Sequence, residues 1–474
     1  MIDRRAFLFG AAGAAVLARP LLGAMPRLPW DALAKRLSGT VVRPGDAGFA
    51  AYARPNNLRY ASRLPLGIAR CRTARDVSAS ILWARENGVP LAARSGGHSY
   101  AGYSTTGGLL IDLREMDAVV FDESTGIATL GGGSRNATFE AAFRHRNLAI
   151  THGRCPSVGI AGLVLGGGIG FNMRAHGITA DRLVATEIVT ADGAIHRLAD
   201  GDDLMWACRG AGGGNFGINT SFSFRTYEVG TRTVFNLIWD VRPEDVFARL
   251  VDILDRAPDA LGSKVSAIAP TATSGIKVQL LGQFEGTPAD LRAMLADVYA
   301  IAEPTGSVVR EPYWKAQAFL AEPGVPAYYQ ERSRFFDRRI DHRAVAAIFD
   351  GLRRYPKTAR EAAFKIFQTG GRVNARKPGD TAFVHRSSSW LSSIELYWQK
   401  TTPDAVLEQN LAWLDAYYAT IVPLAGGGAY QNFIDPSLVD WKAAYHGSNL
   451  ERLEAIKRRV DPSGTFAFAE AIPG

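Results

Sequence analysis

The chain has 474 residues, more than one hydrophobic core ordinarily serves, so two domains are expected. Hydrophobic residues make up 47% and charged residues 21%, which excludes a disordered or fibrous protein. The net charge is +8, but arginine and lysine are scattered and form no basic stripe, so no nucleic-acid partner is expected. No internal apolar run is long enough to span a bilayer, so no membrane partner is expected either.

Residues 1–24, "MIDRRAFLFGAAGAAVLARPLLGA", are typical of a twin-arginine signal peptide. Arg4 and Arg5 are followed by a short apolar stretch rich in alanine and glycine, and cleavage near Ala24 is expected. This predicts a periplasmic or secreted protein, and the alternative is a simple N-terminal membrane anchor. Twin-arginine export carries proteins that are already folded, so the leader itself points to a cofactor inserted in the cytoplasm.

Three cysteines, Cys71, Cys155 and Cys208, make an odd count that cannot form a disulfide framework. No Cys-x-x-Cys or Cys/His spacing suggests zinc, and no metal site is expected. At least one of the three cysteines is therefore free, buried or modified.

The first half of the chain predicts short strands, glycine turns and few helices. Residues 73–90 predict a helix with a capping box of Thr73 and Asp76, and a strand then enters a Gly-Gly turn at residues 96–97. A buried strand at 108–113 and hairpins at 119–133 and 183–198 follow.

Residues 231–424 change character, since strands alternate there with amphipathic helices. The strands are expected at 233–241 and 276–284, and the helices at 243–257, 287–302 and 402–421. A glycine-rich crossing at 423–435 leads to a C-terminal helix, capped at Ser448 and stopped at Asp461-Pro462.

The stretch "GGGNFG", residues 212–217, matches the spacing of a dinucleotide fingerprint. That fingerprint needs a strand before it and a helix after it. Here residues 202–210 look helical and residues 218–227 alternate as a strand, so a Rossmann site is not expected. A glycine-lined approach to another ligand stays open.

Two other glycine-dense stretches carry a reactive side chain each. "RSGGHS", residues 94–99, places His98 after a turn whose amides could hold phosphate, and "HGRCPSVGIAGLVLGGGIG", residues 152–170, has Cys155 at its head. Taken alone, His98 could be an ordinary loop histidine and Cys155 a buried structural cysteine.

Taken together and in order, the motifs resemble a known family. Residues 94–113, 153–183 and 203–218 look like the FAD domain of the berberine bridge enzyme-like oxidases, a domain of the p-cresol methylhydroxylase type. Residues 370–386 and 429–466 look like the substrate-domain and C-terminal motifs of that family. With its leader, the chain resembles a bacterial, exported member.

The resemblance implies an α+β fold with a two-lobed FAD-binding domain, residues 25–230, and a C-terminal segment, residues 425–474, that returns to it. A substrate domain, residues 231–424, would be inserted as an antiparallel sheet backed by helices. FAD would be held by two covalent bonds, from His98 to the 8α methyl carbon and from Cys155 to C6. The residues that the resemblance implies in cofactor binding are Arg94, Ser95, Gly96, Gly97, His98, Ser99, Cys155, Val158, Gly159, Gly162, Gly167, Gly168, Gly170, Ile218, Tyr430 and Asn432.

The resemblance fails at the catalytic base. Many relatives carry tyrosine after the asparagine of the Y-x-N motif, whereas this chain has Phe433, which cannot accept a proton. On the strand after "VHR", the position that usually carries Gln or Glu is Ser393. Glu395 and Tyr397 share its strand face and are the candidate bases, unless both are ordinary polar strand residues. The nearby tryptophans, Trp390 and Trp398, could stack on a substrate ring or belong to the core.

The expected function is a bicovalently flavinylated oxidase that acts on an alcohol or activated C–H of a small molecule. Sugars, oligosaccharides, phenolics and secondary metabolites are substrate classes of the family. Val158 matches a position where a small residue leaves room for O2, which favours an oxidase that releases H2O2. The alternatives are a dehydrogenase with another acceptor and a non-catalytic flavin-bearing binding protein, which Phe433 keeps open.

Overall fold

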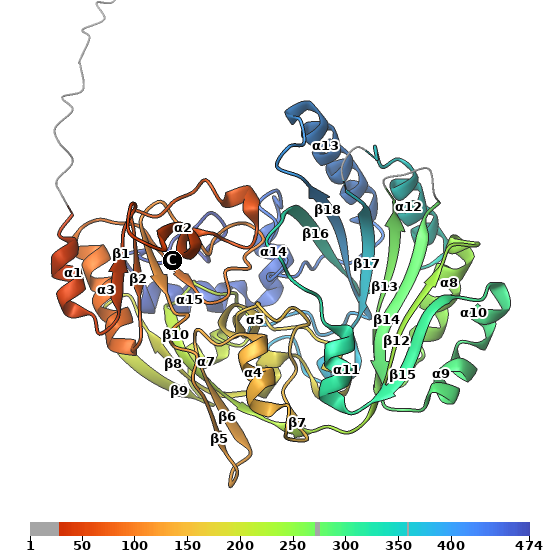
Figure 1. Cartoon of the computed structure of the whole chain (residues 1–474), viewed down its shortest axis with the longest axis horizontal. Coiled ribbons are helices and arrows are strands. Elements are labelled where there is room, and N and C mark those ends of the chain that lie inside the picture. The colour runs from red at the N-terminus through yellow and green to blue at the C-terminus, as the bar shows by residue number, and fades with distance from the viewer. Residues whose placement is uncertain (1–27, 271–274, 358–359) are drawn as a thin grey trace, which may run out of the picture.

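The computed structural model describes residues 28–270, 275–357 and 360–474. The signal peptide predicted at residues 1–24 lies outside these ranges. Within the described ranges, no helix is both long enough and apolar enough to cross a bilayer. Two lobes lie side by side, with the first half of the chain in one and a large sheet in the other (Figure 1).

The first lobe contains two sheets. A four-stranded sheet has the order β1-β2-β4-β3, and β2 and β3 both run parallel to β4. A five-stranded antiparallel sheet has the order β5-β6-β10-β8-β9 and contains both predicted hairpins. The strands are β1 (Thr40–Val42), β2 (Gly67–Arg70), β3 (Leu91–Arg94), β4 (Leu109–Asp112), β5 (Val119–Asp122), β6 (Ile127–Gly131), β8 (Leu183–Val189), β9 (Ile195–Ala199) and β10 (Ile218–Arg225), with a small pair, β7 (Leu148–Ala149) and β11 (Tyr227–Glu228).

Apart from α3, the helices that the first half of the chain contributes to this lobe have eight residues or fewer. The capping box of Thr73 and Asp76 is present at the start of α3 (Ala74–Glu86), which carries the chain across from β2 to β3. The others are α1 (Trp30–Arg36), α2 (Phe49–Ala53), α4 (Asn136–Phe143), α5 (Ile160–Leu165), α6 (Met173–His176) and α7 (Asp203–Ala207), with 3-10 turns at Leu58–Tyr60 and Thr179–Arg182.

The second lobe is a seven-stranded antiparallel sheet of order β15-β12-β14-β13-β17-β18-β16. Its strands are β12 (Arg232–Trp239), β13 (Leu261–Ala269), β14 (Lys277–Phe284), β15 (Thr305–Glu311), β16 (Tyr328–Phe336), β17 (Ala362–Gln368) and β18 (Trp390–Trp398). Its helices are α8 (Pro243–Leu254), α9 (Pro288–Met294), α10 (Ala296–Ile301), α11 (Tyr313–Leu320), α12 (His342–Arg353) and α13 (Asp404–Ile421), with a 3-10 turn at Gly371–Val373.

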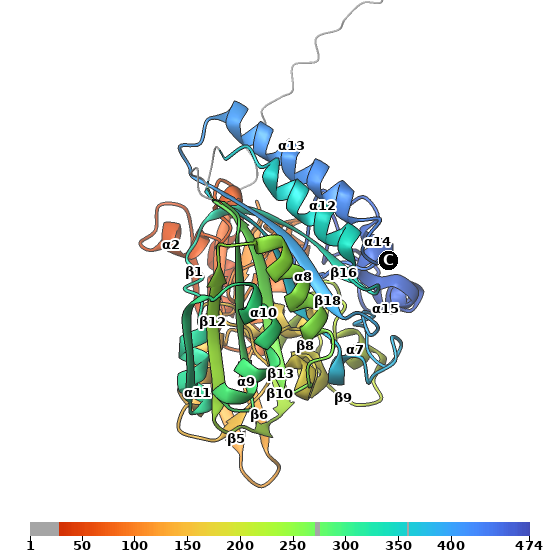
Figure 2. The same ribbon diagram turned by 90° about the vertical axis from the view of Figure 1, so that its right-hand side faces the viewer.

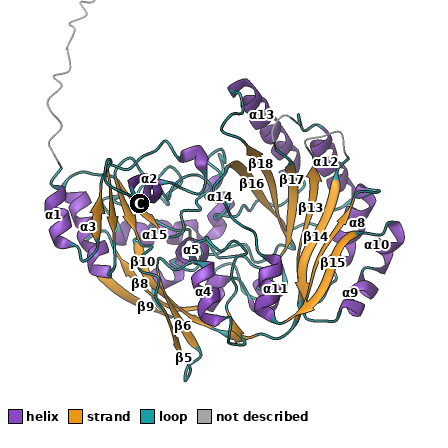
Figure 3. Cartoon of the chain, viewed as in Figure 1, coloured by secondary structure: helices purple, strands orange, loops and turns teal. Residues whose placement is uncertain are grey.

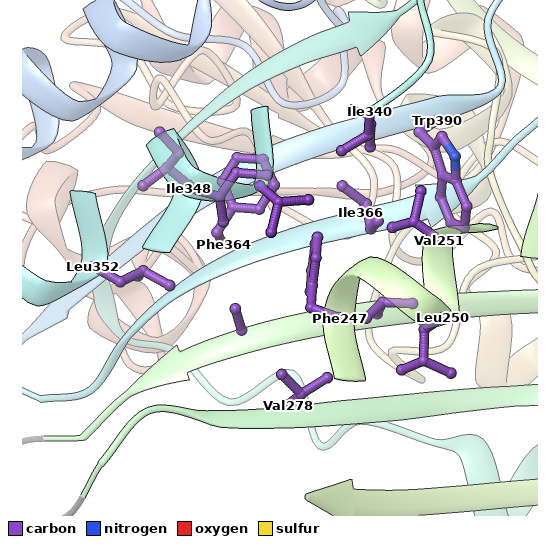
Figure 4. Packing of buried hydrophobic residues seen from close by; sticks show 14 of the residues in the cluster. Phe247, Leu250, Val251, Val278, Ile340, Ile348, Leu352, Phe364, Ile366 and Trp390 are labelled. Atoms are coloured by element: carbon purple, nitrogen blue, oxygen red, sulfur yellow. The ribbon is translucent and has the colours of Figure 1, made fainter. Parts of the chain in front are cut away.

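Most helices of this lobe cover the outer face of the sheet, the face turned away from the first lobe, whereas α11 packs against β12, β14 and β15 on the opposite face (Figures 2 and 3). Phe247 and Leu250 of α8 pack with Ile348 of α12 onto Phe364 and Ile366 of β17 (Figure 4). Burying each such side chain contributes roughly 1.5–3 kcal/mol. Because strand side chains alternate, the intervening side chains of β17 point to the opposite face of the sheet, towards the first lobe.

The C-terminal segment returns to the first lobe through α14 (Trp441–His446) and α15 (Leu450–Val460), where Leu453 and Ile456 join its core. The predicted α+β fold is confirmed, with two local differences. The helix predicted at 287–302 breaks at Leu295 into α9 and α10. The predicted cap at Ser448 is wrong, because residues Gly447–Asn449 already form a 3-10 turn that runs into α15.

Candidate functional site

A cavity of about 720 Å³ lies between the first lobe and the inner face of the large sheet. This volume is in the range of small-molecule and cofactor sites. Most of the predicted site residues line it: Ser95, Gly96, Gly97, His98, Ser99, Cys155, Val158, Gly159, Gly162, Gly170, Ile218, Glu395, Tyr397, Tyr430 and Asn432.

The loop that carries His98 lies directly on the loop that carries Cys155, backbone against backbone. A Cβ on Gly96 would sit 2.2 Å from the amide nitrogen of Gly159, and a Cβ on Gly159 would sit 2.2 Å from that of Gly96. Any side chain at either position would therefore force the loops apart. Glycine is required here by the close approach of two main chains.

A side-chain hydrogen bond ties the same two loops at 2.9 Å, between His98 Nε2 and Ser157 Oγ. Burial, with a smaller contribution from Arg135, lowers the pKa of His98 to about 4. The imidazole is therefore neutral near pH 7, and the bond to Ser157 leaves its Nδ1 available to a ligand.

Of the three cysteines, Cys155 alone lines the cavity. Burial, and next the nearby charge of Glu322, raises the pKa of the Cys155 thiol to about 11. Cys71 and Cys208 are buried in the cores of the first lobe, where Cys208 accepts a hydrogen bond from Asn219 at 3.5 Å. No role for Cys71 or Cys208 follows from the sequence, and in the structure both pack in the hydrophobic core.

Three residues predicted to bind the cofactor do not line the cavity. Arg94 turns away because two of its nitrogens donate to main-chain carbonyl oxygens, Nη1 to Tyr52 at 2.6 Å and Nε to Ser104 at 2.8 Å. Gly167 and Gly168 adopt positive φ behind the wall, where Gly168 donates its amide hydrogen to the Tyr430 hydroxyl at 3.1 Å. These three residues lie behind the lining of the cavity, and their direct contact with a cofactor stays a prediction.

The glycine run at 212–217 is preceded by α7 and followed by β10, so the order expected for a non-Rossmann site is confirmed. The run nevertheless reaches the ligand space, since Gly212, Gly213, Gly214 and Gly217 line the cavity. The C-terminal segment fixes the run, because Lys457 Nζ donates to the Asn215 carbonyl at 2.6 Å. The high glycine content of the run indicated a close approach to a ligand, whereas its G-x-G-x-x-G spacing did not indicate which ligand.

The chemistry of the lining fits FAD. Five buried polar atoms of lining residues have no hydrogen-bond partner among the described residues: Ser95 Oγ, Ser104 Oγ, Gln431 Oε1, His446 Nδ1 and Glu470 Oε1. An unpaired buried polar atom costs about 1–3 kcal/mol, so a ligand that offers hydroxyl and phosphate groups would satisfy them. The glycine turns would let such a ligand lie against main-chain amides.

The inner face of the large sheet forms the opposite wall. Strand alternation sends Glu395 and Tyr397 into the cavity and sends Trp390 and Trp398 into the helix-covered core. The predicted common face of Glu395 and Tyr397 is thus confirmed, and of the two alternatives for Trp390 and Trp398 the structure has the core position. The aromatic wall comes instead from the first lobe and β16, where Tyr100 stacks on Phe433 with centroids 5.2 Å apart.

The wall around Glu395 is charged. Lys365 of β17 forms an ion pair with Glu395, and this carboxylate and Glu331 raise the Lys365 pKa despite the opposing effect of burial. The negative charge of Glu395, followed by burial, holds the pKa of the Tyr397 hydroxyl far above its ordinary value. Tyr397 is therefore a neutral donor, and Glu395 beside it is the ion-pair partner of Lys365. Sequence reasoning missed Lys365 and Glu331, which carry no motif.

Comparison with known proteins agrees with this geometry. A family model described as FAD binding domain matches residues 65–199, and one described as berberine and berberine like matches residues 429–473. The chain is 34% identical to (R)-6-hydroxynicotine oxidase of Paenarthrobacter nicotinovorans over 450 residues, which cover 91% of this chain and 95% of that protein.

The chain is also 30% identical to glucooligosaccharide oxidase of Sarocladium strictum over 438 residues, covering 85% of this chain and 86% of that protein. The structure of the berberine bridge enzyme-like protein 1 of Physcomitrella patens superposes with a TM-score of 0.85 at 25% identity, over 94% of this chain and 99% of that one. The chain therefore belongs to the berberine bridge enzyme-like family of FAD-linked oxidoreductases.

Proposed function

We propose that this protein is an oxidase whose FAD is attached covalently to both His98 and Cys155. It oxidises a hydroxyl-bearing or activated C–H carbon of a sugar, oligosaccharide, phenolic or secondary metabolite, passes the electrons to O2 and releases H2O2. The protein acts after twin-arginine export, in the periplasm or outside the cell. The observation that carries the proposal is the meeting of the His98 and Cys155 loops at one cavity.

FAD, when bound, accepts a hydride from the substrate carbon. The protein then has to hold the substrate and take up the proton of its hydroxyl group. Glu395 suits this role because it lines the cavity and forms an ion pair with Lys365. Tyr397 suits the role of a neutral hydrogen-bond donor to the same substrate.

Two relatives with printed activities differ in substrate, one being a glucooligosaccharide oxidase and the other a hydroxynicotine oxidase. The shared requirement is a ring that carries a polar group. The cavity offers aromatic faces, Tyr100 and Tyr329, next to the carboxyl group of Glu395. A sugar or an aromatic ring could stack there with its hydroxyl group towards Glu395.

Double attachment predicts that colour survives denaturation. The His98→Ala and Cys155→Ala single variants should each keep yellow flavin in the acid-precipitated protein, because one bond remains. The double variant should release all of it to the supernatant. The measurement is the absorbance spectrum of pellet and supernatant, and complete release from the wild-type protein would contradict both bonds.

The loop contact predicts a sharp difference between two cavity glycines. Gly96→Ala places a Cβ 2.2 Å from the Gly159 nitrogen, so the loops must separate and flavin content should fall several-fold. Gly107→Ala is the matched control, since a Cβ there meets nothing within 4 Å. The ratio of flavin to protein absorbance in the purified variants measures the effect, and equal ratios would show that the contact is dispensable.

The proton acceptor is tested by anaerobic flavin reduction. Glu395→Gln should slow reduction by about 10²–10⁴-fold, the usual contribution of a general base, while Tyr397→Phe should slow it less. Stopped-flow absorbance at saturating substrate gives both rates. If neither variant slows reduction, the base lies elsewhere in the cavity.

Use of O2 is tested on the reduced protein. Mixing with air-saturated buffer should reoxidise the flavin faster than steady-state turnover, with peroxide formed in equal amount to substrate consumed. Val158→Phe should slow only this step, because it fills the cavity wall that the small residue leaves open. Slow reoxidation of the wild-type protein would point to a dehydrogenase with another acceptor, and no peroxide or reduction across sugars and phenolics would point to a binding protein.

A further inference from the structure

A second carboxyl group stands directly opposite Glu395 on the wall of the cavity. Glu331 of β16 is the paired residue of Glu395 of β18 in the antiparallel ladder. Directly opposite residues have Cβ atoms about 4.5–5.5 Å apart and point to the same face. Both side chains line the cavity, and Glu331 is only 3% exposed.

The two carboxyl groups differ in their partners. Lys365 pairs with Glu395, whereas no lysine, arginine or histidine among the described residues forms an ion pair with Glu331. The other carboxylate of this wall, Glu322, is paired with Arg154 at 2.5 Å. One of the two facing acids is thus neutralised by a cation and the other is not.

Several titratable groups face Glu331 and interact with it electrostatically. They are Glu395 and Tyr397 on β18, Lys365 on β17, Tyr329 on β16 and Tyr100 from the first lobe. Burial, followed by the charge of Glu395, raises the pKa of Glu331 to about 8. Lys264 lies on β13, the strand next to β17, and burial lowers its pKa to about 7. This amine therefore adds little positive charge above pH 7.

We propose that Glu331 is a further catalytic residue, the neutral acid that donates a hydrogen bond to the same substrate oxygen whose proton Glu395 accepts. This inference rests on the proposed function and defines the substrate group as a single hydroxyl. A hydroxyl has one proton to give and a lone pair to receive a hydrogen bond. An ionised carboxylate can accept the proton of this hydroxyl group while a protonated carboxyl group donates to its oxygen. Two carboxylates would repel each other, and only one of them could accept the single hydroxyl proton.

The protons and electrons balance over the step. Before reaction, Glu331 carries one proton and Glu395 carries none. The C–H bond breaks and its hydrogen leaves with both electrons to the flavin, while the O–H bond breaks and its proton moves to Glu395. The carbon–oxygen bond becomes a carbonyl, which still accepts the hydrogen bond from Glu331. The pair then holds two protons, and one passes to solvent before the next turnover.

The first test needs no substrate. Infrared difference spectra of the holoprotein, taken from about one pH unit below to one above pH 8, should show loss of a protonated-carboxyl stretching band. Glu331→Gln should remove that band. Glu395→Gln should keep it but move its midpoint to lower pH, because the neighbouring negative charge is gone.

Two matched variants sharpen this test. Glu322→Gln should leave the band in place, since Glu322 is paired with Arg154. Burial raises the pKa of Glu470 to about 7, so Glu470→Gln removes that group's own contribution. A band that persists in Glu331→Gln, measured in the Glu470→Gln background, would overturn the proposal.

The second test follows anaerobic flavin reduction with xylobiose and with a phenolic alcohol as probes. In the wild-type protein, the reduction rate divided by the substrate dissociation constant should fall about tenfold per pH unit above pH 8. Glu331→Gln keeps a donor that does not titrate, so this fall should disappear. Glu331→Met keeps the length but loses the donor, and below pH 8 its substrate dissociation constant should be about tenfold or more above that of the wild-type protein.

The outcomes separate this proposal from the function on which it rests. If Glu331→Gln retains the alkaline fall and Glu331→Met binds both probes normally, Glu331 is structural and the proposal fails, while Glu395 and the oxidase remain. If neither probe reduces the flavin at any pH although the infrared band behaves as expected, the substrate class of the proposed function fails instead.

Discussion

The structure depends on one contact, the meeting of two main chains at Gly96 and Gly159. These residues come from separate parts of the chain, and neither loop could approach the other if a Cβ intervened. The contact brings His98 next to Ser157 and places the glycine run after Cys155 along the same cavity. The amides, the imidazole and the thiol therefore face one ligand space. Arg94 and Tyr430 hold neighbouring main chain in place, since Arg94 donates to the carbonyl oxygens of Tyr52 and Ser104 and the Tyr430 hydroxyl accepts from the Gly168 amide.

On the opposite wall, the alternation of side chains along a strand determines which residues reach the cavity. Helices cover one face of the seven-stranded sheet, so every second residue of β17 and β18 is committed to a hydrophobic core. The intervening positions then become available for polar groups, and Lys365, Glu395 and Tyr397 occupy them. A charged cluster can be buried there because its members neutralise one another, and the outer core supplies the stability that the cluster does not. One sheet thus serves as both scaffold and reactive surface.

Much of this could be predicted from sequence where the signal is local. The capping box at Thr73, the two hairpins and the common strand face of Glu395 and Tyr397 follow from short-range patterns, and the structure has them all. Motif order was enough to give the family and the fold. What failed depended on long-range pairing. The register that sets Glu331 against Glu395 joins strands far apart in the chain, and no local pattern encodes it.

The orientations of Arg94, Trp390 and Trp398 also depend on parts of the chain that are far away in sequence. Arg94 sits in a motif that suggests ligand contact, but the carbonyls that capture its guanidinium come from residues some forty positions earlier. Trp390 and Trp398 could have faced either side of their strand, and only the helices packed outside the sheet decide the question.

The order of the chain has a consequence for how the cavity is made. Its walls include Tyr430, Asn432 and Glu470, and Lys457 ties this last segment to the glycine run at 212–217. A nascent polypeptide still on the ribosome lacks this closing piece, however well its earlier portions have folded. The cavity is consequently complete only after this segment has folded back onto the first lobe, and a truncation near the carboxyl terminus removes a wall of the cavity rather than a dispensable tail.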